Sequence, residues 1–98
     1  MIEKQFLIAE WTGFSRPASI LVIVSSNYKS SVEIHFNGIN VNLKSKDIPR
    51  TIMKVISMGI RPGLPFVIKA EGEDEQDVIK AIHKSLYKNS GRIINFGI

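Results

Sequence analysis

The chain contains no cysteine, which excludes a disulfide framework and a thiolate metal site. It also lacks a long apolar run, because its longest one, residues 20–24, is far too short to cross a bilayer. Residues 1–5 do not resemble a signal peptide, and no cluster of basic residues interleaved with aromatics marks a nucleic-acid surface. We therefore expect a cytoplasmic protein that contacts neither membrane nor nucleic acid.

What the chain does contain is enough apolar material for one small domain. Its 98 residues are 44% hydrophobic, so we expect a single packed domain over residues 1–98. The net charge of +4 suits an acidic protein partner or a solvated surface equally well. Residues 91–98 form an apolar C-terminal tail. Such a tail either docks on its own domain, which we favour, or adds a strand to the sheet of a neighbour.

Alternating and apolar runs predict four strands, at residues 2–9, 32–36, 39–43 and 64–70. The second and third strands are separated by Asn37-Gly38, which predicts a hairpin with a two-residue type I′ turn. Within this hairpin, His35 alternates onto the polar face together with Glu33. We therefore expect that histidine to face solvent.

Residues 16–28 carry two conflicting signals. Their β-branched residues favour a strand, whereas Pro17 and the spacing of Ala18, Leu21 and Val22 allow a helix. Another helix follows Asp74, which is expected as its N-cap. On that helix His83 lies on the polar side and is expected to be solvated.

Between these helices, Pro49 limits where a further helix can begin. A proline is not tolerated in a helix interior, and it biases the residue before it away from helical angles. The helix should therefore begin between Pro49 and Ile52, with Thr51 as its N-cap. In a rival start, Pro49 takes the first helical position and Thr51 lies inside the first turn.

The stretch Thr12-Gly13-Phe14-Ser15-Arg16-Pro17-Ala18 connects the first strand to the first helix. Gly13 can turn the chain, and Arg16 lies beside the free N–H groups of a helix start. An arginine at a helix N-terminus forms an anion site. The simpler interpretation is a strand-to-helix turn with a solvated arginine.

This stretch resembles the active-site segment of the HPr family, the small phosphocarriers of the bacterial sugar phosphotransferase system. The family pattern is Thr-Gly-x-His-Ala-Arg-Pro-Ala; residues 12–18 are one residue shorter and lack the histidine. Val41-Asn42-Leu43-Lys44 and residues 51–59 also resemble family segments, separated here by about six extra residues. Over residues 2–90 the resemblance implies an α+β, HPr-like open-faced sandwich: a four-stranded antiparallel sheet with three helices on one face. It favours the helix for residues 16–28.

The resemblance also implies which chemistry is lost and which is kept. The family histidine carries the phosphoryl group, whereas Ser15, in its region, would form a stable ester and trap it. We therefore expect no catalytic residue. HPr and its relative Crh are also phosphorylated by a kinase on a serine of the second helix in some Gram-positive bacteria. Thr51 matches that serine by the residues after it and Ser45 by the residues before it, and we prefer Thr51.

Phosphorylation in the family controls the binding of a partner. Ile52, Met53 and Ile56 match the family's apolar contact patch, with Ser15, Arg16 and Ser19 as bordering anion- and partner-binding residues. The first hypothesis is a non-catalytic regulator of the phosphotransferase or carbon catabolite system. Its partner would be a transcriptional regulator, HPr kinase or a metabolic enzyme.

Two further hypotheses belong to other classes of protein. One is an HPr-fold module that is never phosphorylated and acts by binding or by forming a homodimer. The other is an enzyme, which we disfavour because the sequence has no metal cluster, no nucleophile beside a base and no glycine-rich phosphate loop. No cofactor is expected.

Overall fold

The fold is described by a computed structural model that covers residues 1–8, 14–61, 63–90 and 93–96. Side chains are described up to Leu86, and only the backbone thereafter. The predicted turn at Gly13 lies outside the described residues.

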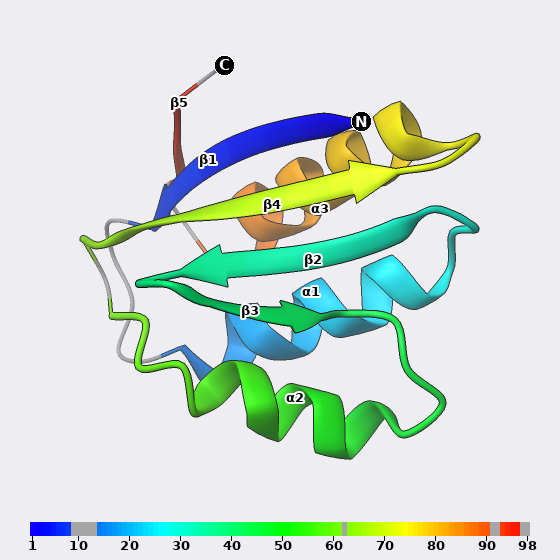
Figure 1. Cartoon of the computed structure of the whole chain (residues 1–98). Coiled ribbons are helices and arrows are strands. Elements are labelled where there is room, and N and C mark those ends of the chain that lie inside the picture. The colour runs from blue at the N-terminus through cyan, green and yellow to red at the C-terminus, as the bar shows by residue number, and fades with distance from the viewer. Residues whose placement is uncertain (9–13, 62, 91–92, 97–98) are drawn as a thin grey trace.

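Five strands form one antiparallel sheet, and three helices lie together on one of its faces (Figure 1). The strand order is β3-β2-β4-β1-β5, so β4 is the central strand. In chain order the elements are β1 (Ile2–Ile8), α1 (Ser15–Ser26), β2 (Ser31–Phe36), β3 (Ile39–Asn42), α2 (Ile48–Ile56), β4 (Pro65–Glu71), α3 (Glu75–Ser90) and β5 (Ile93–Phe96). The α+β class, the four predicted strands and the three predicted helices are confirmed.

The C-terminal tail extends the expected four-stranded sheet. Strand β5 pairs antiparallel with β1, with Leu7 opposite Ile94 and Gln5 opposite Phe96. The prediction that the tail docks on its own domain is therefore confirmed for residues 93–96. It docks as a fifth strand, because β1 would otherwise present an unpaired sheet edge.

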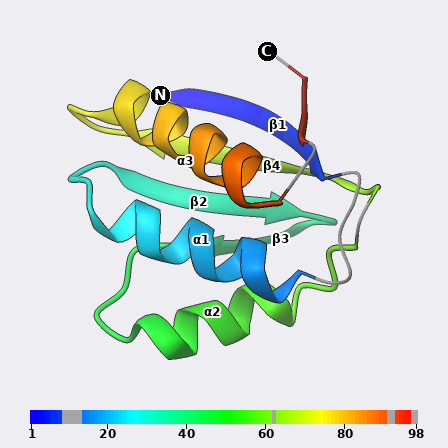
Figure 2. The same cartoon turned by 180° about the vertical axis from the view of Figure 1, so that it is seen from behind.

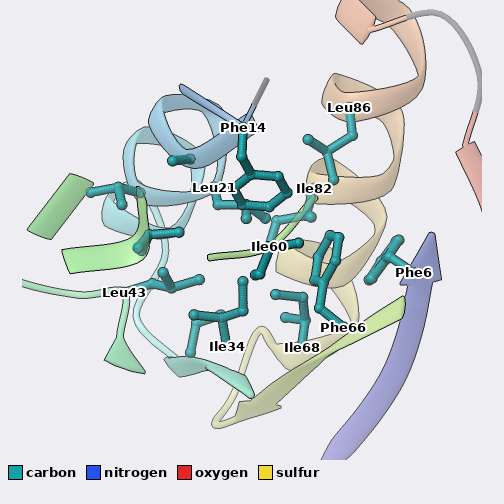
Figure 3. Packing of buried hydrophobic residues seen from close by; sticks show 14 of the residues in the cluster. Phe6, Phe14, Leu21, Ile34, Leu43, Ile60, Phe66, Ile68, Ile82 and Leu86 are labelled. Atoms are coloured by element: carbon teal, nitrogen blue, oxygen red, sulfur yellow. The ribbon is translucent and has the colours of Figure 1, made fainter. Parts of the chain in front are cut away.

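Aromatic rings join the sheet to the helix layer. The ring of Phe66 on β4 stacks on Phe6 of β1 at a centroid distance of 5.9 Å. The ring of Phe14, at the start of α1, meets Phe66 edge-on at 5.5 Å. Figure 3 shows these rings packed among Leu21, Ile82 and the other buried apolar side chains between the two layers. This core fixes where α1 begins relative to the sheet.

Helix α1 forms despite its β-branched sequence. Its buried face includes Ala18, Leu21 and Val22, which are fully covered, and helices α2 and α3 flank it on either side (Figure 2). Burial of this face outweighs the strand propensity of the run, because tertiary packing overrides a local preference. Ile23 is the exception on α1, since half of its side chain is exposed.

Helix α2 begins earlier than the sequence predicts. Asp47 is its N-cap: the carboxylate Oδ1 accepts a hydrogen bond from the backbone N–H of Arg50 at 3.2 Å. Pro49 is accommodated in the first turn, where its missing N–H needs no partner. The prediction that Thr51 caps the helix is wrong, and the rival start at Pro49 is only one residue late.

Asp74 joins two loops as well as preceding α3. Its backbone carbonyl accepts the helical bond from Val78, as the predicted N-cap position requires. Its carboxylate instead accepts hydrogen bonds from the N–H groups of Lys29 and Ser30, each at 2.8 Å, and from the Ser30 hydroxyl. The serine hydroxyl, followed by the Lys29 N–H, lowers the Asp74 pKa from 3.8 to about 2.

Gly72 allows these two loops to approach each other. Its φ is +150°, and a Cβ at this position would lie 2.6 Å from Ser30 Oγ and 2.7 Å from Ser30 Cα.

The substitution Gly72→Ala should therefore lower the free energy of unfolding by about 2 to 4 kcal/mol, measured by urea denaturation. Gly59→Ala is the control, because its φ of +81° carries backbone strain but its Cβ would meet open space. Equal losses in the two variants would refute close packing at Gly72.

The lowered pKa of Asp74 predicts how this junction responds to acid. Because the folded pKa is below the unfolded one, the stabilisation is fully present above about pH 4. It is lost as the pH falls toward about 2, when the folded carboxylate also takes up a proton. Asp74→Asn should be less stable than the parent chain at pH 7, and this difference should shrink between pH 4 and pH 2. A difference that stays constant over this range, followed by urea denaturation at each pH, would contradict the assignment.

Candidate functional site

The start of α1 presents polar side chains because an aromatic one is buried beside them. Phe14 is only 8% exposed, whereas the next two residues, Ser15 and Arg16, are exposed. The Ser15 carbonyl accepts a hydrogen bond from the Ser19 hydroxyl at 3.1 Å. The structure thus brings together three of the residues that the sequence proposes for binding: Ser15, Arg16 and Ser19.

The N-terminus of α1 has no side-chain cap and no acidic residue in its first turn. Its first helical bond runs from the N–H of Ala18 to the carbonyl of Phe14, at 2.9 Å. The N–H groups of Ser15 and Arg16 precede that bond and lie at the positive end of the helix dipole. This arrangement suits an anion, although anion binding here stays a prediction.

Neither histidine of the chain belongs to this helix start. His35 points from β2 to the sheet face opposite the helices, where its Nε2 lies 3.0 Å from Glu33 Oε1. The prediction that these two residues share one face of the sheet is therefore confirmed. His83 on α3 is partly exposed and its ring centroid is 6.2 Å from that of Phe6, so the side chain is solvated only in part.

The apolar residues expected as a contact patch divide between core and surface. Ile52 and Ile56 are partly buried and pack against the core. Met53, by contrast, is 60% exposed, so its side chain is open to solvent. Since α1 and α2 pack side by side, this patch lies in the same helix layer as Arg16 and Ser19 (Figure 2).

The two candidates for phosphorylation lie in different environments. Thr51 is 3% exposed, and its hydroxyl donates a hydrogen bond to the Asp47 carbonyl at 3.0 Å. Ser45 is exposed in the loop before α2, where its Oγ accepts a hydrogen bond from the N–H of Asp47 at 3.1 Å. The Ser45 residue is therefore open to solvent, whereas the Thr51 hydroxyl is covered in this conformation.

Sequence reasoning proposed Met53 but missed the other residues on the far side of α2. A groove of about 390 Å³ separates this helix from β3, and its lining combines apolar and basic side chains: Ile39, Val41, Arg50, Met53, Lys54, Ser57 and Met58. The signal for it is the alternation of β3 followed by basic residues four apart in α2. Over the described residues no group of three or more histidine, aspartate or glutamate side chains is placed to hold a metal ion.

Comparison with known proteins assigns this architecture. The family of the PTS HPr component phosphorylation site matches residues 2–88. The chain belongs to the HPr family. The histidine-containing phosphocarrier protein of Mycoplasma is 31% identical to this HPr-family chain, with a TM-score of 0.76 over 90% of this chain and 94% of that one.

Two further solved structures extend the comparison. An HPr from Thermoanaerobacter tengcongensis is 31% identical, with a TM-score of 0.76 over 94% of this chain and 98% of that one. Crh of Bacillus subtilis, which crystallised as a swapped dimer, is 24% identical, with a TM-score of 0.61 over 88% of each chain. The likeness to Crh shows a shared fold. None of the helices described for this HPr-family chain is long and apolar enough to span a membrane.

The contrast between Ser45 and Thr51 can be tested by placing a charge at each position. Ser45→Glu should change the free energy of unfolding by no more than about 0.5 kcal/mol, since the side chain points to solvent. Thr51→Glu should cost about 2 to 4 kcal/mol, because it buries a carboxylate without a partner. Thr51→Val keeps the shape and should cost only about 1 kcal/mol for the lost hydrogen bond. Urea denaturation measures all three, and a Thr51→Glu variant as stable as the parent would show that this position accommodates charge.

Proposed function

We propose that this chain is a non-catalytic regulatory protein of the HPr family that has lost histidine phosphotransfer and acts by binding a protein partner in the cytoplasm. The observation that carries the proposal is the exposed Ser15 at the uncapped start of α1. In the sequence pattern of the family, a histidine accompanies this helix start.

The chemistry of Ser15 supports the loss of phosphotransfer. A phosphohistidine can pass its phosphoryl group on, whereas a serine ester is stable and would retain it. Serine also needs a neighbouring base to become a nucleophile, and both histidines belong to other elements of the fold. His35 is paired with Glu33, and His83 lies against the ring of Phe6. Arg16 remains available to bind an anion or a carboxylate of the partner.

A phosphorylation switch near the start of α2 completes the proposal. Exposure favours Ser45 over Thr51, which reverses the preference drawn from the sequence. In the kinase step the Ser45 oxygen would bond to the γ-phosphorus of ATP, ADP would leave, and the hydroxyl proton would pass to a base on the kinase. The product adds about −1.5 to −2 charge close to the α2 N-terminus. That end of α2 is the positive end of its dipole, and Lys44, Lys46 and Arg50 lie close in sequence.

The second candidate is an HPr-fold module that binds or oligomerises without any phosphorylation. Exposed apolar side chains favour it, because Ile23 on α1 and Met53 on α2 are each more than half exposed. This candidate and the regulator differ in one observable, which is whether phosphate ever appears on the protein.

Intact-mass spectrometry after two separate incubations tests the proposal. With ATP and an HPr kinase, we expect one phosphate on the parent chain, none on Ser45→Ala and one on Thr51→Val. With phosphoenolpyruvate and the first enzyme of the sugar phosphotransferase system, we expect no phosphate on any of them. Phosphate lost in Thr51→Val but kept in Ser45→Ala would return the switch to the buried threonine.

The remaining outcomes separate the hypotheses. No phosphate in either incubation would favour the unphosphorylated binding module. Phosphate transferred from phosphoenolpyruvate would refute the loss of phosphotransfer, and digestion of the labelled protein would then identify the accepting residue.

A further inference from the structure

Strand β3 forms one edge of the described sheet, where it pairs with β2 alone. The N–H of Leu43, just after β3, donates to the Val32 carbonyl at 2.8 Å. In an antiparallel pair such bonds alternate along the strand, so Ile39 and Val41 also bond to β2. The main-chain N–H and C=O groups of Asn40 and Asn42 therefore point away from the sheet. Both residues are exposed, so these groups can accept a further strand.

The groove described above lies beside this edge. Ile39 and Val41 stand opposite Phe36 and Ile34, which places their side chains on the helix side of the sheet. Helix α2 runs next to β3 on that side and forms the other wall (Figure 1). Ile39 and Met53, from opposite walls, are 51% and 60% exposed. Two large apolar side chains are thus open to solvent in one hollow of the surface.

The charge of the groove is one-sided. Arg50 and Lys54 belong to its lining and are exposed, and no acidic residue lines it. Neither cation takes part in the ion pairs found among residues 1–8, 14–61 and 63–86. Four residues of helix separate them by about 6 Å along the axis, close to the about 6.6 Å between alternate residues of a strand. A strand with carboxylates two residues apart therefore matches their spacing.

We propose that the groove between β3 and α2 binds an extended acidic segment of a partner protein, which adds to the sheet as a strand beside β3. The main chain of that segment would hydrogen-bond to Asn40 and Asn42. Its inward side chains would place apolar groups against Ile39 and Met53, and carboxylates against Arg50 and Lys54.

Charge decides between such a partner and a second copy of this chain. Pairing β3 with the β3 of another copy would bring Arg50 and Lys54 of both copies to one interface. Like charges placed together at an interface cost several kcal/mol as an order of magnitude, and each chain already carries a net charge of +4. An acidic segment gains attraction from the same two residues.

This surface goes beyond the proposed function and needs no phosphorylation. It shares Met53 with the contact patch of α2, but its other wall is the edge strand, which is not part of that patch. Whether or not a peptide binds this surface therefore says nothing about whether Ser45 is a kinase substrate.

The test uses the full chain labelled with ¹⁵N and a blocked heptapeptide, Val-Thr-Glu-Thr-Glu-Thr-Val. Its alternate positions present two valines and two glutamates to the groove. We expect saturable shifts of the backbone amides of β3 and α2, and slower solvent exchange at Asn40 and Asn42. A matched peptide with lysine in place of glutamate should bind at least tenfold more weakly. No saturation by the glutamate peptide at about 1 mM would overturn the proposal.

Charge reversal provides the matched variants. Arg50→Glu together with Lys54→Glu should invert the preference, so that the lysine peptide binds at least tenfold better than the glutamate peptide. Lys80→Glu with Lys84→Glu makes the same change in net charge at exposed positions of α3 and should bind as the parent chain does. Equal weakening in the two double variants would show only a long-range charge effect and would overturn the site.

Strand addition is separated from simple groove binding by N-methylation. In one peptide the three threonine amides are methylated and in another the two glutamate amides, and these two sets face opposite edges of an extended strand. We expect one peptide to lose binding at least tenfold and the other to keep it; any other pattern overturns strand addition. Concentration-dependent shifts of Asn40 and Asn42 without peptide, with a dimeric mass in solution, would identify a second copy as the occupant and refute the acidic partner.

Discussion

The edge-to-face contact between Phe14 and Phe66 fixes the relation of the helix layer to the sheet. Phe66 belongs to the central strand β4, which is hydrogen-bonded to a neighbouring strand along each of its edges. The ring of Phe14 therefore packs on a strand that is fixed from both edges. Such an aromatic pair contributes about 0.5–1.5 kcal/mol beyond the area that it buries. Because Phe14 is drawn inward, the chain must turn Ser15 and Arg16 outward at the first residues of α1. The polar start of this helix is thus a consequence of core packing.

Charge is used in two different ways over the surface. Asp74 and Glu75 serve the fold: the first binds the loop after α1, and the second pairs with the N-terminal amino group at 3.1 Å. The Gly72 N–H and that amino group both lower the pKa of Glu75. Arg50 and Lys54 of α2, by contrast, have no ion-pair partner among the described side chains. Asp74 and Glu75 thus hold parts of the fold together, whereas Arg50 and Lys54 leave their charges exposed at the surface of α2.

Local structure is predicted best from the sequence where only a few residue types can adopt the required backbone conformation. Asn37 and Gly38 have φ values of 52° and 79°, as the type I′ turn requires, and few other residue pairs accept them. The predicted start of α2 is too late, because it gives Pro49 more weight than the capping ability of Asp47 two residues before it. A proline is compatible with a first turn whenever a good cap precedes it.

The side chains of the candidate site depend on packing that no local pattern records. Ser45 and Thr51 are both hydroxyl residues near the start of α2, and their spacing in the sequence does not show which of them is buried. Only the structure shows that Thr51 is buried and that its hydroxyl bonds to the Asp47 carbonyl. Ile52 and Met53 are neighbours in sequence, yet only the methionine is exposed, because the helix turns the isoleucine toward the core. The groove beside β3 likewise needs two elements whose separation in space is set by the whole fold.

The position of β1 has a consequence for how the protein is made. All of the strand pairs of β1 are with β4 and β5, which are formed by residues 65–71 and 93–96. During synthesis both edges of β1 therefore stay unpaired until residues 65–71 have left the ribosome, and the edge that β5 covers stays unpaired until residues 93–96 follow. Contacts between such distant segments form slowly, because a long loop must close before they are gained. In that interval the unpaired edges of β1 are open to a strand from another copy of the chain. The edge that β5 covers stays open longer than the other, because residues 93–96 follow residues 65–71 in the chain.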